Sequence, residues 1–183
     1  MNSYTRLEKY DKIDWEVITA DLLNQAGSII TPDASKWNIS TPGYLEIYKL
    51  WEDANFNSSA IKWINYYPDR EFSLEIVNTI SADLKIKHIR SWISRIDPGY
   101  FAPWHWDVDD NEEEYLSKGK IQRFSIFIEP PTFGHIFILG KDYLINESLG
   151  SVIKWNDHRE WHSGINAGMV PKFMLHVLGN QLS

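Results

Sequence analysis

The chain has 183 residues, of which 43% are hydrophobic and 23% charged, a balance that suits one globular domain with a substantial core. Its 25 acidic and 18 basic residues give a net charge of -7, which argues against nucleic acid as the main partner, because phosphate binding requires clustered lysine and arginine. The absence of cysteine excludes disulfides, thiolate metal ligands and a cysteine nucleophile.

The start of the chain and its uniform texture give two further expectations. The sequence MNSYTRLEKYDK is polar and lacks the apolar core of a signal peptide, and no apolar stretch is as long as a membrane span. Together with the absence of cysteine, this favours a cytoplasmic protein without a membrane partner. No repeat or Gly/Ser-rich linker divides the chain, so we expect one domain over residues 1–183, with a mixed helical part (1–87) and a jelly-roll core (88–179).

The N-terminal part is expected to be largely helical. Residues 14–26 carry apolar side chains near one helical face and end before a glycine, which is a stop signal. Residues 44–54 follow a Pro-Gly pair and predict a second helix, and residues 71–84 predict a third. Between these two, residues 60–68 alternate like a strand and end at a proline.

The texture changes at His88, where short runs rich in β-branched and aromatic residues begin, separated by turn residues. The seven runs are residues 88–96, 100–107, 120–130, 134–140, 141–145, 151–156 and 172–179. Short strands at this spacing predict a sandwich or barrel. The expected fold class is therefore α+β with a mainly β core: a double-stranded β-helix, or cupin-like jelly roll, with the N-terminal helices packed on it.

The segment PWHWDVDD, residues 103–110, carries the first candidate metal ligands. His105 and Asp107 are two residues apart, so in a strand both side chains project to the same side. Trp104 and Trp106 then face the other side, which is most simply core. Two ligands on one strand do not close a metal site, so a third must come from another strand.

Four histidines besides His88 could supply that third ligand: His135, His158, His162 and His176. His158 and His162 have the spacing of a zincin pair, but Arg159 stands where that motif needs a glutamate, so we discount a helical zinc site. Two imidazoles and one carboxylate suit non-haem Fe(II), which leaves coordination positions open for other ligands. A closed zinc site would need a fourth protein ligand, and the chain has no cysteine.

Two basic residues lie in runs that are otherwise apolar. Lys172 begins a strand-like run, and alternation puts it on one face with Met174 and His176. Arg123 and Ser125 share a face of the run 120–130. An arginine in such a strand is costly unless it meets an anion or a carboxylate. A strand with one solvated face is the alternative.

Three segments together resemble the aspartyl/asparaginyl β-hydroxylase-like branch of the Fe(II)/2-oxoglutarate-dependent oxygenases. SWISRIDPGYFAPWHWD (91–107) looks like the strand, Pro-Gly turn and HxD strand of that family. KIQRFSIFIEPP (120–131) is similar to a family strand that carries an arginine. LGSVIKWNDHREWHSGINAGMVPKFMLHV (149–177) is similar to its sequence of glycine, apolar strand, histidine, asparagine and basic residue. These segments lie within residues 88–179, about half of the chain.

The resemblance implies a site residue by residue. It implies that Fe(II) is bound by His105, Asp107 and His162. The residues implied for 2-oxoglutarate are Lys172 at its distal carboxylate, Arg123 near its other end, and Ser94 and Ser125 in support. The chain departs from the family at three positions: Lys172 stands where arginine is usual, Ser125 where histidine is frequent, and Asp107 where some members lack a carboxylate.

The function implied is hydroxylation of an unactivated C–H bond with O2, with release of succinate and CO2. The expected substrate is an amino acid, a peptidyl Asp or Asn, or a small amine-bearing metabolite, and no protein catalytic group is expected beyond the metal centre. Trp161 and Tyr100 are candidate substrate contacts. The acidic run 107–114 is expected to be a solvated loop, with a lid over a cationic substrate as the alternative. A cupin-like metal-dependent isomerase or hydrolase and a non-catalytic jelly-roll binding module are the competing functions.

Overall fold

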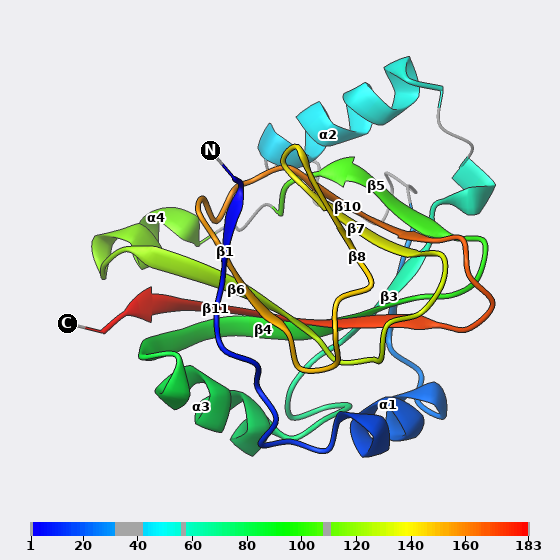
Figure 1. Cartoon of the computed structure of the whole chain (residues 1–183). Coiled ribbons are helices and arrows are strands. Elements are labelled where there is room, and N and C mark those ends of the chain that lie inside the picture. The colour runs from blue at the N-terminus through cyan, green and yellow to red at the C-terminus, as the bar shows by residue number, and fades with distance from the viewer. Residues whose placement is uncertain (1, 32–41, 56–57, 108–110, 183) are drawn as a thin grey trace.

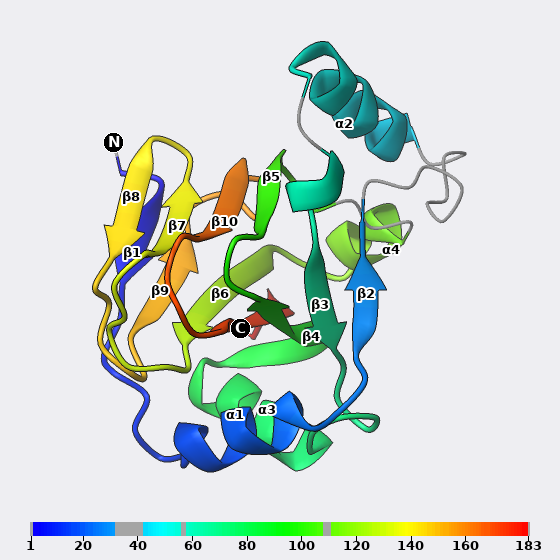
Figure 2. The ribbon, with the colours of Figure 1, turned by 90° about the vertical axis from the view of Figure 1, so that its right-hand side faces the viewer.

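Two antiparallel sheets face each other in the computed structural model, which describes residues 2–31, 42–55, 58–107 and 111–182 (Figure 1, Figure 2). The larger sheet has the order β1 (Tyr4–Arg6), β9 (Val152–Trp155), β6 (Ile121–Phe127), β11 (Lys172–Gln181), β4 (Ile86–Ile96), β3 (Trp63–Tyr66) and β2 (Ser28–Ile30). The smaller sheet has the order β5 (Phe101–His105), β10 (His162–Asn166), β7 (His135–Leu139) and β8 (Asp142–Ile145). This arrangement confirms the expected jelly-roll core, which is mainly β.

The two faces of the larger sheet differ because its central strands alternate in polarity. Phe124 of β6 and Phe173 and Leu175 of β11 point outward into one hydrophobic cluster. Arg123 and Lys172 point inward, between the sheets. The register between these strands, antiparallel throughout, keeps the two sets on opposite faces.

The helices α1 (Trp15–Leu23) and α3 (Leu74–Asp83) cover the outer face of the larger sheet (Figure 2). Both begin at a polar cap, since Asp14 accepts a hydrogen bond from the Val17 amide and Ser73 accepts one from the Glu75 amide. Trp15 and Leu22 of α1 and Ile80 of α3 belong to the cluster formed by the outer face of the sheet. The packing of N-terminal helices on the β core is therefore confirmed for this pair.

A third expected helix is present as α2 (Pro42–Asp53), followed by the short 3-10 helix η2 (Ser58–Ala60). It lies beside the end of the sandwich where β5 and β10 meet (Figure 2). Its Ile47 and Trp51 join a small cluster with Ile61. None of the described helices is long and apolar enough to cross a membrane.

The structure differs from the sequence-based prediction at several elements. Strands β1, β2 and β10 were not expected, and the first 87 residues contribute β1, β2 and β3 to the larger sheet. The acidic run expected as a loop ends within helix α4 (Glu112–Ser117), whereas residues 108–110 of that run lie outside the described residues. The core position predicted for Trp104 is wrong: it is 37% exposed, because it points to the face of the smaller sheet that lies away from the cavity.

Candidate metal centre and cavity

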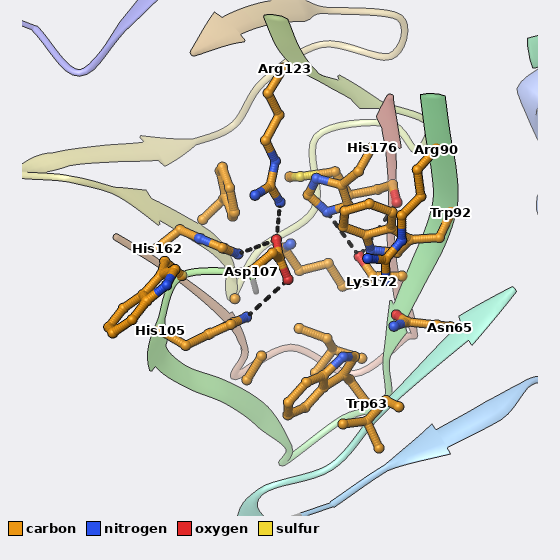
Figure 3. A pocket seen from close by; sticks show the side chains of 18 of the residues that line it. Trp63, Asn65, Arg90, Trp92, His105, Asp107, Arg123, His162, Lys172 and His176 are labelled. Atoms are coloured by element: carbon orange, nitrogen blue, oxygen red, sulfur yellow. Dashed lines mark hydrogen bonds and ion pairs between the residues drawn. The ribbon is translucent and has the colours of Figure 1, made fainter. Parts of the chain in front are cut away.

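A cavity of about 280 Å³ lies between the two sheets. Its floor consists of inward-facing side chains of β3, β4, β6 and β11, and its roof comes from β5, β7 and β10 (Figure 3). The volume lies just below the range typical of small-molecule sites, about 300 to 1,000 Å³. Most of the residues predicted from the sequence to form a site line this space.

His105, Asp107 and His162 converge at one side of the cavity (Figure 3). His105 ends β5 and His162 begins β10, and the sheet register places the two residues directly opposite each other. His162 Nε2 is 3.4 Å from Asp107 Oδ2, and His105 Nε2 is 3.9 Å from Asp107 Oδ1. One ligand atom from each residue lies within 4.8 Å of the other two, so the three side chains could hold a metal ion.

Both imidazoles present Nε2 to the centre because Nδ1 is engaged by the backbone. His105 Nδ1 lies 2.6 Å from the carbonyl oxygen of Pro103, and His162 Nδ1 lies 3.2 Å from that of Glu160. A carbonyl only accepts hydrogen bonds, so Nδ1 carries the proton in each ring and Nε2 keeps its lone pair. A second ring nitrogen fixed in this way is the usual support of a metal-binding histidine.

Burial keeps the two imidazoles neutral. It lowers the pKa of His105 to about 3, and the neighbouring His162 contributes to the shift. It also lowers the pKa of His162, against the attraction of the Asp107 carboxylate. Aromatic rings fix both: Trp63 stacks on His105 with centroids 5.7 Å apart, and Trp155 meets His162 edge-on at 4.8 Å.

Arg123 forms an ion pair with Asp107. Only 1% of Arg123 is exposed, and its Nη2 is in close contact with Asp107 Oδ2. The guanidinium carbon lies 3.6 Å from the centre of the Trp155 ring. Burial, the largest single influence, would raise the pKa of Asp107, but Arg123 together with His162 and His105 outweighs it and holds this pKa well below its usual range. Arg123 therefore has the carboxylate partner that was expected for an arginine in an otherwise apolar strand.

Lys172 lines the same cavity from the start of β11 and is 4% exposed. Burial lowers the pKa of its ammonium to about 8, although the charge of Glu129 acts in the opposite direction. Glu129 is engaged by His135 Nδ1 at 2.6 Å and by the Phe173 amide at 2.8 Å. Within the described residues, Lys172 has no ion pair with a carboxylate, and its ammonium nitrogen lies 5.6 Å from the centre of the Phe137 ring.

The two serines predicted for co-substrate binding lie in different places. Ser94 lines the cavity, with its hydroxyl 3.4 Å from His176 Nε2. Ser125 is fully buried behind that surface, 2.9 Å from His176 Nδ1, and it accepts a hydrogen bond from the Trp155 indole. The structure thus brings Ser94 to the cavity and leaves Ser125 beneath it, where its hydroxyl supports two aromatic side chains.

The two predicted substrate contacts do not line the cavity. Trp161 packs against Trp106 with centroids 4.5 Å apart and stacks on Trp104 at 6.2 Å. Of these three, Trp106 lines the cavity. Tyr100 lies in the turn before β5, with the Lys62 ammonium 5.3 Å from its ring.

Three of the other histidines have partners elsewhere. His88 bonds to Ser91, His135 to Glu129 and His158 to Glu112. The segment containing His158 is not helical, in agreement with the rejection of a zincin pair. His176 lines the cavity and stacks on Trp92 with centroids 5.1 Å apart. The sequence signal for this position was the alternation that puts His176 on the same strand face as Lys172.

Sequence reasoning missed the cavity residues that come from β3 and from the first half of β4. Arg90 and Trp92 come from a strand that was expected, but their inward face was not identified. Trp63 and Asn65 come from β3, whose place beside β4 has no local signal in the sequence. The pairing of distant strands had to be known before these residues could be assigned.

Comparisons with known proteins identify the fold. No family model matches the chain, and no curated protein matches it. A viral collagen prolyl hydroxylase from Paramecium Bursaria Chlorella virus-1, solved with 2-oxoglutarate, is similar with a TM-score of 0.55 and 12% identity, over 98% of this chain and 96% of that one. An oxidoreductase of the 2OG-Fe(II) oxygenase family from Burkholderia pseudomallei is similar with a TM-score of 0.50 and 14% identity, over 98% of this chain and 87% of that one. The chain therefore has the fold seen in 2-oxoglutarate- and Fe(II)-dependent oxygenases.

Proposed function

We propose that the protein is an Fe(II)- and 2-oxoglutarate-dependent dioxygenase that hydroxylates an unactivated C–H bond. The observation that carries this proposal is one cavity that holds both a His-Asp-His cluster and a buried lysine without a carboxylate partner among the described residues. The first group provides metal ligands and the second a counter-charge for an anion. The fold shared with the two oxygenase structures supports the same function.

The donor set fits Fe(II). Two neutral imidazole nitrogens and one carboxylate are the ligands of non-haem iron sites that keep coordination positions open. Their separations of 3.4 and 3.9 Å are close to the distance of about 3 Å expected between neighbouring atoms that bind one metal at about 2.1 Å. His105, Asp107 and His162 would hold the metal. Within the proposed function, Fe(II) with 2-oxoglutarate and O2 supplies the oxidation of the C–H bond, with release of succinate and CO2.

The protein side chains bind, orient and exclude water. Lys172 would bind the distal carboxylate of 2-oxoglutarate through a charge-assisted hydrogen bond, and Ser94 would assist from the adjacent strand. Arg123 keeps Asp107 ionised and fixes its orientation toward the two histidines. We assign Arg123 this positioning role in place of direct contact with the co-substrate. Met174 and Phe137 provide apolar walls between these polar groups.

Two other functions use the same fold. A cupin-like isomerase or hydrolase would use the metal ligands without 2-oxoglutarate, and Lys172 would then form a salt bridge to an acidic residue. Within the described residues Lys172 has no such salt bridge, which favours the oxygenase. A non-catalytic binding module would not require three ligand atoms within 4.8 Å of one another.

The substrate class is part of the proposal. The resemblance in sequence suggests an amino acid, a peptidyl Asp or Asn, or a small amine-bearing metabolite. The likeness to a collagen prolyl hydroxylase adds peptidyl proline to the substrates to be tested. The small volume of the cavity favours a small molecule or a single side chain over a larger group.

Reconstitution tests the proposal. The purified protein, loaded with Fe(II) under argon, should bind 2-oxoglutarate in calorimetry and form succinate when O2 is admitted. His162→Ala should abolish metal-dependent binding, whereas His88→Ala is the matched control, because His88 bonds to Ser91 away from the metal ligands. A metal-loaded protein that binds no 2-oxoglutarate would contradict the proposed function.

A further inference from the structure

The cavity continues beyond the groups assigned to metal and 2-oxoglutarate. Its second part is formed by β3, β4 and their neighbours and is lined by Ile30, Ile47, Trp63, Asn65, Tyr67 and Arg90. In Figure 3, Asn65 and Arg90 lie across the cavity from His105 and His162. We refer to these six residues as the distal subsite. The proposed chemistry needs a substrate near the metal. The distal subsite is a part of the cavity wall that is not assigned to the metal or to 2-oxoglutarate, so it is available for that substrate.

Asn65 provides the first indication of what binds there. Its side chain shares the inner face of the sheet with Ser94, its register partner on β4. Asn65 is 9% exposed, yet its Oδ1 has no hydrogen-bond partner within the described residues. Buried amide oxygens in folded proteins nearly always accept a hydrogen bond. A ligand with an N–H or O–H group directed at Asn65 would supply the missing donor.

Arg90 provides the second indication. Its guanidinium carbon lies 4.9 Å from the centre of the Trp92 ring, a contact that orients the planar group beside the cavity. A guanidinium has five N–H donors, so it can bind a carboxylate through two of them while others serve protein partners. Arg90 is therefore suited to a carboxylate that enters the distal subsite.

The charges around the cavity agree with this assignment. Three basic side chains line it, namely Arg90, Arg123 and Lys172. Asp107, already paired with Arg123, is the one carboxylate among the described residues that line it. Among the described lining residues, a substrate that is only a cation would thus meet no unpaired acidic partner, whereas an anionic group would be attracted.

We propose that the distal subsite binds the substrate as a small carboxylate with an adjacent N–H or O–H donor, that is, a free amino acid or hydroxy acid. Arg90 would bind the carboxylate, Asn65 would accept from the donor, and the rest of the molecule would lie between the indoles of Trp63 and Trp92. This inference rests on the proposed function and narrows its substrate to one class.

The test compares matched compounds in the 2-oxoglutarate assay. The twenty protein amino acids are screened first for stimulation of succinate formation and for a mass increase of one oxygen atom. The best amino acid is then compared with its 2-hydroxy acid, its methyl ester and the amine that lacks the carboxylate; for leucine this amine is 3-methylbutylamine. The amino acid or hydroxy acid should be oxidised, and the ester and amine should not.

Variants of the distal subsite locate the effect. Arg90→Gln and Asn65→Leu should each raise the substrate KM by roughly tenfold or more, since each removes a hydrogen bond to a charged or donor group. The dissociation constant of 2-oxoglutarate, measured without substrate, should change by a smaller factor. Lys87→Gln is the control, because Lys87 is an exposed residue of the same strand.

Three results would overturn the inference. One is a response to none of the acids, another is equal oxidation of the ester or amine, and the third is an unchanged substrate KM in both variants. If wild-type protein forms succinate while any of these holds, the substrate class is wrong and the proposed function stands. If wild-type protein does not bind 2-oxoglutarate at all, the proposed function fails and the substrate inference fails with it.

Discussion

Replacement of Lys172 by methionine should stabilise the ligand-free protein while it removes 2-oxoglutarate binding. Burial lowers the pKa of the ammonium from 10.5 to about 8. Each pH unit corresponds to about 1.36 kcal/mol, so at pH 7 the folded protein carries a penalty of about 3 kcal/mol for keeping this group charged. Methionine has a similar volume and no charge, and it should remove most of that penalty.

The sign of the effect follows from linkage. A lysine whose pKa is lowered in the folded state exerts its whole destabilising effect below about pH 8. This penalty disappears as pH rises from about 8 to 10.5. Urea unfolding of metal-free wild type and Lys172→Met should therefore differ by about 3 kcal/mol at pH 7 and by much less near pH 10. Lys87→Met, at an exposed position, is the control. A variant less stable than wild type at pH 7 would refute the reasoning.

Three further predictions concern the same cavity. Affinity for 2-oxoglutarate should decline above about pH 8 as Lys172 loses its proton, and Lys172→Arg should shift this decline to higher pH, which calorimetry between pH 6.5 and 9.5 would detect. Arg123→Met should lower the free energy of unfolding by about 3 kcal/mol or more, because it leaves the buried Oδ2 atom of Asp107 without its partner, whereas Arg6→Met, at a pair with an exposed arginine, should cost less than about 1 kcal/mol. His162→Ala should remove the stabilisation that Mn(II) or Co(II) gives in thermal melts, and an unchanged metal response would contradict its role as a ligand.

Alternation along β6 and β11 was sufficient to predict which of their side chains face inward and which face outward. The pattern in the β11 segment assigned Lys172 and His176 to one face, and both line the cavity. The pattern in β6 assigned Arg123 to the face opposite Phe124, and the two are so divided. These predictions succeed because side chains on a strand have a period of two, whatever the strand pairs with.

Elements that depend on distant partners were not predictable in this way. Strand β10 begins with His162 and contains Gly164, and its pattern HSGIN has no alternation of apolar and polar residues. It is a strand because β5 and β7 flank it on both sides. β1 and β2 are each three residues long, too short for a periodic signal.

The residues of the candidate site also fall into two groups: those that local sequence predicts and those that only the fold identifies. The sequence and its family resemblance predicted the candidate metal ligands and Lys172, since each lies in a local motif. The partner of Arg123 required the fold, because Asp107 follows β5 of the smaller sheet whereas Arg123 belongs to β6 of the larger one. The same is true of Asn65, which reaches the cavity through its pairing with Ser94.

The electrostatics of the cavity link ligand binding to stability. Lys172 is buried without an ion-pair partner among the described residues, so a bound carboxylate would raise its pKa toward the ordinary value and recover the penalty of burial. Ligand binding to the folded state alone raises stability by about 2.7 kcal/mol when its concentration is 100 times the dissociation constant. 2-Oxoglutarate should therefore raise the melting temperature of the metal-loaded wild type and leave that of metal-loaded Lys172→Met unchanged. Equal shifts in the two proteins would mean that the co-substrate binds without Lys172, and the buried ammonium would then need another explanation.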